Sequence, residues 1–129
     1  MSEVLPGDQQ SLKRDETYNL IAASKVQGTD VYNSAGEHIG DIDELMIDKM
    51  SGKVAYAVIT FGGFLGMGQQ RRALPWSILT YSTGEQGYVT DASDDILRST
   101  PETDDYANRD WGTRLHQHYG VPPYWLPKE

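Results

Sequence analysis

The strongest hydrophobic pattern in the chain lies at residues 53–61, where apolar side chains occupy most positions. Successive side chains of a strand point to opposite faces. Two apolar sets therefore result: Val54, Tyr56 and Val58 on one face, and Ala55, Ala57, Ile59 and Phe61 on the other. This pattern predicts a strand that is buried on both sides. A polar turn at residues 49–52, ending in Gly52, joins it to an upstream strand and predicts a β-hairpin.

In that upstream strand the apolar positions change face part-way along. Ile42 has an even number, whereas Leu45 and Ile47 have odd numbers. A regular strand cannot point all three side chains inward, because its faces alternate with a period of two. A β-bulge at Asp43 and Glu44 would bring all three to the core, and bulges of this kind bend strands into small barrels.

Shorter apolar segments on both sides of the hairpin predict further strands. We expect these strands at residues 30–32, 71–76, 77–81 and 87–90, followed by a helical turn at 94–98, while residues 37–40 begin the upstream strand of the hairpin. The pattern predicts an all-β domain over residues 19–99, a small barrel or sandwich with a short closing helical turn. Residues 1–18 have too few apolar side chains to offset the entropy of ordering, so we expect a flexible N-terminal arm.

The composition changes again over residues 100–129. Residues 91–105 are rich in Asp and Glu with a single base, Arg98, and predict a solvated acidic linker. Helical spacing follows at Trp111, Leu115 and either His118 or Tyr119, with Gly120 as the stop. Residues 121–127 contain three prolines and two aromatic residues, a composition typical of polyproline II. We therefore expect an acidic linker and a partly helical aromatic tail.

The energetics of ordering this tail suggest where it binds. Burying its aromatic side chains would release several kcal/mol at about 25 cal/mol per Å². Ordering roughly twenty residues costs a comparable or larger amount. From this balance we expect the tail to dock across a subunit boundary or on a partner protein, in preference to its own barrel.

The overall charge excludes several classes of partner. The chain has 129 residues, a formal net charge of −8 and no cysteine. An acidic surface repels nucleic acid and anionic lipid. No apolar run has the roughly 20 residues that a membrane helix needs, and the N-terminus does not match a signal peptide. We expect a cytoplasmic protein that neither binds nucleic acid nor inserts into a membrane.

No motif in the sequence predicts catalysis, a cofactor or a metal site. His38, His116 and His118 do not have the spacing of a metal-binding pair on a helix, and no serine lies in a Gly-x-Ser-x-Gly turn. The glycines of residues 62–68 lack the Gly-Lys-Ser/Thr of a phosphate-binding loop. The acidic linker lacks the ligand spacing of an EF-hand. We therefore expect a protein that is not an enzyme.

Apolar side chains outside the expected core predict a contact surface. Phe64, Leu65 and Met67 lie on the glycine-rich loop, where they bury little within their own domain. With four tail aromatics they form the predicted partner-binding set: Phe64, Leu65, Met67, Trp111, Tyr119, Tyr124 and Trp125. We expect a homodimer or a protein partner.

Two alternatives stay open beside that prediction. The first is a small-ligand or metal-sensing domain that uses a cleft between barrel and tail, with Tyr81, Tyr88 and the histidines. The second concerns Arg71 and Arg72, which are expected to balance the carboxylates of Asp41, Asp43 and Glu44, with an anion site as the less favoured interpretation.

Several short motifs occur in the order found in a known family. These are His38-Ile39-Gly40 with Ile42, Leu45-Met46-Ile47-Asp48, Gly52-Lys53-Val54, Tyr56-Ala57-Val58, Phe61-Gly62-Gly63 and Leu74-Pro75-Trp76. Over residues 20–98 the chain resembles the PRC-barrel family, which includes the cytoplasmic domain of the photosynthetic reaction-centre H subunit. The sequence is most similar to stand-alone bacterial members. The resemblance implies a small all-β barrel used as a scaffold for protein contacts, with no shared catalytic residues.

Overall fold

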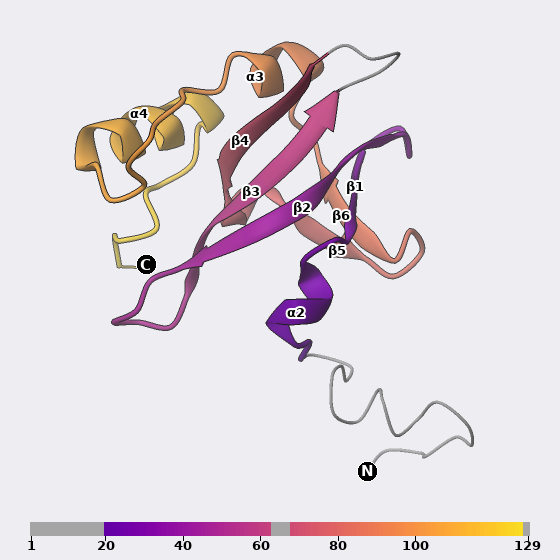
Figure 1. Cartoon of the computed structure of the whole chain (residues 1–129), viewed down its shortest axis with the longest axis horizontal. Coiled ribbons are helices and arrows are strands. Elements are labelled where there is room, and N and C mark those ends of the chain that lie inside the picture. Colours follow the sequence, from indigo (N-terminus) through magenta and orange to yellow (C-terminus); the bar gives the residue numbers. More distant parts are fainter. Residues whose placement is uncertain (1–19, 63–67, 128–129) are drawn as a thin grey trace.

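The computed structural model describes residues 20–62 and 68–127, and its centre is one six-stranded sheet (Figure 1). The strands are β1 (Asp30–Asn33), β2 (His38–Ile47), β3 (Val54–Gly62), β4 (Gln69–Pro75), β5 (Thr80–Ser82) and β6 (Gly87–Thr90). The helices are α2 (Ala23–Val26), the 3₁₀ turn η2 (Trp76–Ile78), α3 (Asp94–Arg98) and α4 (Arg109–Tyr119). None of these helices is long and apolar enough to cross a membrane.

The strand order in the sheet is β4-β3-β2-β1-β6-β5. Neighbouring strands are antiparallel except for the parallel pair β1 and β6. The prediction of an all-β domain with a short helix at residues 94–98 is thus confirmed. The predicted closed barrel is not seen: β4 and β5 end the strand order, and no pairing joins them in the part of the chain that the structure describes.

The central hairpin has the predicted bulge and one further irregularity. The register between β2 and β3 shifts between Ile42 and Glu44, so the bulge is confirmed, and Ile42 and Leu45 both pack on the inner side of the sheet. A second shift lies between Met46 and Ile47. The extra residue of this shift is Ala55 of β3, so the shift changes the face of side chains on β3. Ile47, the last residue of β2, is 48% exposed, so the predicted burial of Ile47 in the core is wrong.

Strand β3 separates two hydrophobic cores, as its apolar pattern predicts. The inner core contains Val31, Ile42, Ala57, Ile59, Phe61, Leu74, Leu79, Tyr88 and Leu97, with Val26 of α2. The outer cluster contains Ala55, Tyr56, Val58, Ala73, Trp111 and Leu115. Ala55 was expected on the inner face; it joins Tyr56 in the outer cluster because the second register shift lies beside both residues.

The outer cluster is closed by the C-terminal tail, which docks on its own sheet (Figure 1). Trp111 is 1% exposed and Leu115 is fully buried. The expectation of docking across a subunit or on a partner is therefore wrong for this conformation. The sequence argument left out the receiving surface: Tyr56, Val58 and Ala73 would be exposed without the tail, so their burial adds to the gain.

The end signals of α4 explain why the tail is helical. The side chain of Asn108 accepts a hydrogen bond from the backbone N–H of Trp111, and Gly120 ends the helix with φ of 69°. The predicted helix and its stop are confirmed. The predicted polyproline II segment instead bends in a turn, in which the N–H of Leu126 donates to the carbonyl of Pro123 at 3.2 Å.

The acidic linker is only partly solvated. Its carboxylates are exposed, as predicted, but Leu97 and Thr100 between them are buried. The hydroxyl groups of Thr100 and Tyr119 share a hydrogen bond of 2.5 Å, and the Thr100 hydroxyl also donates to the carbonyl of Leu97. This segment therefore attaches α4 to the sheet instead of separating the two.

Candidate interaction surfaces

The contact between tail and sheet is an aromatic cluster around Tyr56 of β3. The ring centroid of Tyr56 lies 5.0 Å from that of Trp111, 5.4 Å from Tyr124 and 5.8 Å from His116. The indole N–H of Trp111 donates to the carbonyl of Pro101 at 2.9 Å, which satisfies its one polar atom. Burial raises the pKa of Tyr56 to about 12, so its hydroxyl stays neutral at physiological pH.

His116 fixes the last turn of the chain to α4. Its side chain is buried, and its Nε2 accepts a hydrogen bond from the backbone N–H of Tyr124 at 3.3 Å. Since Nε2 accepts, the proton of the neutral ring lies on Nδ1 and is donated to the carbonyl of Gly112 at 2.7 Å. Burial lowers the pKa of His116 below its usual 6.5. The histidine is therefore a neutral structural group.

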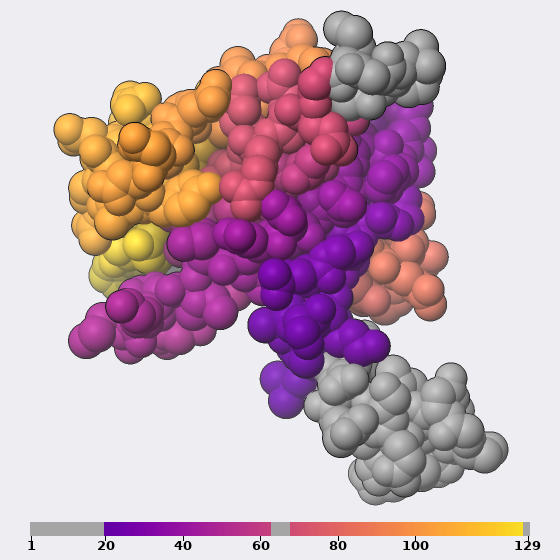
Figure 2. All heavy atoms as spheres, in the orientation of Figure 1, coloured from indigo at the N-terminus to yellow at the C-terminus, as the bar shows by residue number. Residues whose placement is uncertain are grey.

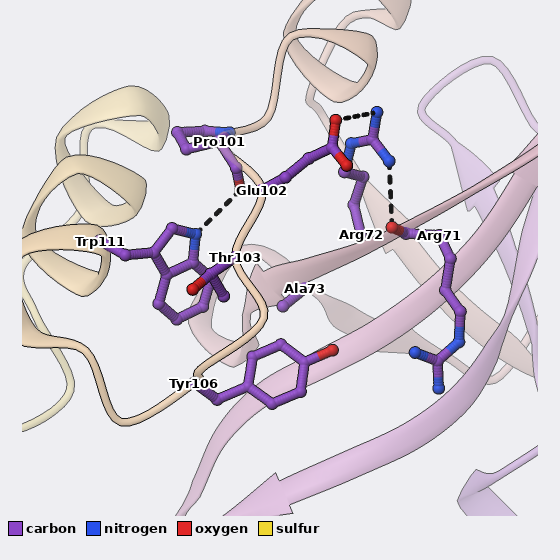
Figure 3. Close-up of a pocket in the computed structure, with 8 residues that line it drawn as sticks. All are labelled: Arg71, Arg72, Ala73, Pro101, Glu102, Thr103, Tyr106 and Trp111. Carbon is purple, nitrogen blue, oxygen red and sulfur yellow. Dashed lines mark hydrogen bonds and ion pairs between the residues drawn. The ribbon is translucent and has the colours of Figure 1, made fainter.

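A small cleft lies between β4 and residues 101–106 (Figure 3). Its empty volume is about 260 Å³ including the open mouth, and its most buried cation is Arg72. The guanidinium of Arg72 pairs with Glu102 at 3.1 Å and bonds the side-chain oxygen of Gln70 and the carbonyl of Arg71. Its Nε is buried without a partner among the described residues.

The arginine pair behaves largely as predicted. Arg71 forms ion pairs with Asp43 at 2.7 Å and Glu44 at 3.3 Å across the outer face of β3. Hydrogen bonding to Asp43 raises the pKa of Arg71. The predicted pairing with Asp41 does not occur among the described residues. Arg72, in contrast, lines the cleft and pairs with Glu102 instead of with the carboxylates of β2.

The residues of the ligand-sensing alternative are spread over the molecule. His38 pairs with Asp30, His116 lies in the outer cluster, and His118 contacts the carbonyl of Ile96. Tyr81 and Tyr88 stack on each other and do not line the cleft. No three His, Asp or Glu side chains in residues 20–62 and 68–127 form a group that could hold a metal ion.

Three of the exposed apolar side chains among the described residues come from the β2–β3 hairpin and the tail, and we call this region the tip surface. The two segments meet at Tyr56 of β3, which pairs with Met46 of β2 and lies 5.4 Å from Tyr124 of the tail. Met50 is 94% exposed in the β2–β3 turn, and Ile47 precedes that turn. Leu126, 49% exposed, and Trp125 come from the tail, and Arg109 lies 3.9 Å above the Trp125 ring. Figure 2 shows the hairpin projecting from the body close to the yellow C-terminal residues.

The predicted partner-binding residues fall into three groups. Phe64, Leu65 and Met67 lie outside the described residues. Trp111 is buried inside the outer cluster, so it meets a partner only if the tail undocks. Tyr119, Tyr124 and Trp125 are half-buried at the margin of the cluster, where Tyr124 and Trp125 are brought together by stacking at 5.1 Å.

Sequence reasoning missed Ile47, Met50 and Leu126 of the tip surface. Ile47 was assigned to the core because it shares the parity of Leu45, but it is the last residue of β2 and is half exposed there. Met50 carried a readable signal, since a large apolar residue in a polar turn buries little. Leu126 carried none, because its exposure depends on how the tail bends after Pro123.

These features define a small β-sheet domain with an aromatic C-terminal segment docked on its outer face. Comparison with known families identifies the domain. The model of the PRC-barrel domain matches residues 19–97, so the chain belongs to the PRC-barrel family. The match ends within α3, before the segment that forms α4 and the outer cluster. No curated protein matches the sequence.

Proposed function

We propose that this chain is a non-catalytic protein-interaction or assembly module built on a PRC-barrel domain. One observation carries the proposal: among the residues that the structure describes, three of the five exposed large apolar side chains, Ile47, Met50 and Leu126, belong to the hairpin and tail segments that meet at the tip surface. Scattered apolar side chains are normal on a protein surface, whereas a contiguous group marks a contact site. The sheet behind that surface is packed on both faces of β3, which suits a rigid scaffold.

The proposed setting is the bacterial cytoplasm, with a homodimer or a protein partner as the assembly. Support for a cytoplasmic setting comes from an acidic chain with no cysteine, whose folding needs no oxidising compartment. The resemblance to stand-alone bacterial family members supports the same setting. Nucleic acid is disfavoured as a partner by the net charge of −8.

A second candidate function is small-ligand sensing in the Arg72 cleft. The unpartnered Nε of Arg72 favours it, because a buried guanidinium N–H without an acceptor is costly. A small carboxylate would satisfy that group, but Glu102 already holds the neighbouring nitrogen. The cleft therefore fits a ligand only if Glu102 moves away, which makes this candidate the weaker one.

Native mass spectrometry of the full chain purified from its own host separates the two functions. A stoichiometric protein subunit, either a second copy or another chain, supports the interaction module. A bound small mass, lost in the variant Arg72→Met but retained in Arg71→Met, supports the sensing function. A bare monomer with neither kind of addition contradicts both proposals.

A further inference from the structure

Five of the eight Lys and Arg side chains in residues 20–62 and 68–127 form no ion pair with a described carboxylate, and three of these five adjoin the tip surface. Three arginines, Arg71, Arg72 and Arg98, form ion pairs with carboxylates. Lys49 and Lys53 of the β2–β3 turn and Arg109 of α4 form none with any residue that the structure describes. All three adjoin the tip surface, which therefore combines exposed apolar side chains with unpaired positive charge.

The carboxylate of Asp48, at the start of the β2–β3 turn, is already engaged in hydrogen bonds. Asp48 accepts hydrogen bonds from the Ser51 hydroxyl at 2.7 Å and from the backbone N–H of Met50 at 3.3 Å. These hydrogen bonds, with a smaller contribution from Arg109, lower the pKa of Asp48. Its charge stabilises the turn, and it forms no ion pair with Lys49 or Lys53. The turn thus holds its shape while its lysines stay available.

We propose that the tip surface binds an acidic protein segment that carries at least one large apolar side chain. The inference rests on the proposed interaction function and names the chemistry of the partner. The apolar side chain would pack against the exposed side chains of the tip surface, Ile47, Met50 and Leu126. Carboxylates on either side of it would reach Lys49, Lys53 and Arg109, so that charge complementarity fixes the orientation.

An anionic lipid surface shares part of this chemistry, but the rest of the chain opposes it. With a net charge of −8, the body of the protein repels a membrane that the tip would have to approach. A single protein segment avoids this repulsion, because it needs to reach only the tip, and charges beyond about 8–10 Å are largely screened at physiological salt.

The test begins with a photo-cross-linker placed at residue 50 of the full chain in its host. The captured peptide is sequenced by mass spectrometry, synthesised and titrated against the purified full chain by calorimetry. We expect a segment with a net negative charge and at least one large apolar residue. Its affinity should fall at least about tenfold in the double variant Lys49→Glu/Lys53→Glu, since two complementary charges become repulsive.

The matched control is the double variant Lys25→Glu/Arg114→Glu. Both residues are exposed and unpaired with described carboxylates, and the change in net charge is identical. We expect this control to retain most of the affinity. A second variant, Met50→Ser, leaves the net charge unchanged. It should weaken peptide binding without changing the salt dependence of the affinity.

Several outcomes overturn the inference. These are a captured segment that is basic or lacks large apolar residues, equal loss in tip and control variants, capture of lipid together with binding to phosphatidylserine vesicles, and no capture at all. The proposed function fails separately. If a stoichiometric protein subunit is present but its binding ignores every tip substitution, the interaction module stands and only the tip inference is wrong.

Discussion

The hydrogen bonds of His116 predict a loss of stability in acid. Burial holds its folded-state pKa below the usual value, so the unfolded chain binds the extra proton more readily. Stability from this group is present above pH ~6.5 and is lost as pH falls toward the lower folded-state pKa, by at most about 1.4 kcal/mol per pH unit. Protonation also puts a second N–H opposite that of Tyr124.

The groups that face His116 give this titration no opposing charge. The ring of His116 is surrounded by Tyr56 of β3 and by Tyr124 and Trp125 of the tail. Arg109 lies over the ring of Trp125. Urea unfolding at pH 7.5 and 5.5, followed by tryptophan fluorescence, measures the effect. The variant His116→Gln should lose less stability between these pH values than the natural chain. An unchanged slope in His116→Gln would show that other groups carry the acid sensitivity.

Burial makes opposite predictions for two isoleucines of β2. Ile42 is 1% exposed in the inner core, so Ile42→Ala should cost about 2–4 kcal/mol of unfolding free energy. Ile47 is about half exposed on the tip surface, so Ile47→Ala should cost less than about 1 kcal/mol. Chemical denaturation of both variants checks the pair. Equal costs would show that Ile47 is as buried as Ile42 in solution.

At the scale of elements, local signals predicted more than long-range ones. The strand pattern, the bulge after Ile42 and the stop of α4 at Gly120 were all readable, because each depends on residues a few positions apart. The second shift was not, since it requires knowing that Ala55 faces the tail. The sequence also could not predict whether the sheet closes into a barrel, because closure depends on whether the distant strands β4 and β5 pair.

The candidate site was the part least accessible from sequence. Tail aromatics were singled out as a docking segment for a partner or a second subunit, but the surface that receives them here lies on β3, more than forty residues earlier in the chain. Trp111 was predicted to bind a partner because the sequence does not show that Tyr56 of the same chain provides the surface on which Trp111 packs. The tip surface likewise combines the β2–β3 turn with Leu126 of the tail, and sequence gives no reason to place them together.

Docking of α4 predicts a local opening that is separate from global unfolding. Leu115 is fully buried against the sheet, so Leu115→Ala weakens the outer cluster without touching the inner core. Amide hydrogen exchange should become faster throughout α4 and on β3, while β1 and β6 keep their protection. Gln117→Ala, at an exposed position of the same helix, should change neither. Uniform loss of protection in all strands would instead make the tail part of one cooperative core.

For the whole molecule, charge and apolar surface are arranged to favour association at one corner. Most carboxylates lie on the body, whereas Lys49, Lys53 and Arg109 adjoin the apolar tip. A protein with a net charge of −8 resists non-specific self-association, so any stable dimer requires a defined surface. Two such surfaces are candidates: the tip surface and the apolar residues of the loop after β3, which lie outside the described residues.

Light scattering of the full chain at micromolar concentrations distinguishes these two surfaces. We expect a dimer or higher oligomer, because large apolar side chains left in water favour burial at about 25 cal/mol per Å². If the loop forms the contact, Phe64→Ser/Leu65→Ser should give a monomer and Met50→Ser should not. If the tip forms it, the effects reverse. A monomer in the natural chain at every concentration rules out the homodimer and leaves a different protein as the partner of the tip surface.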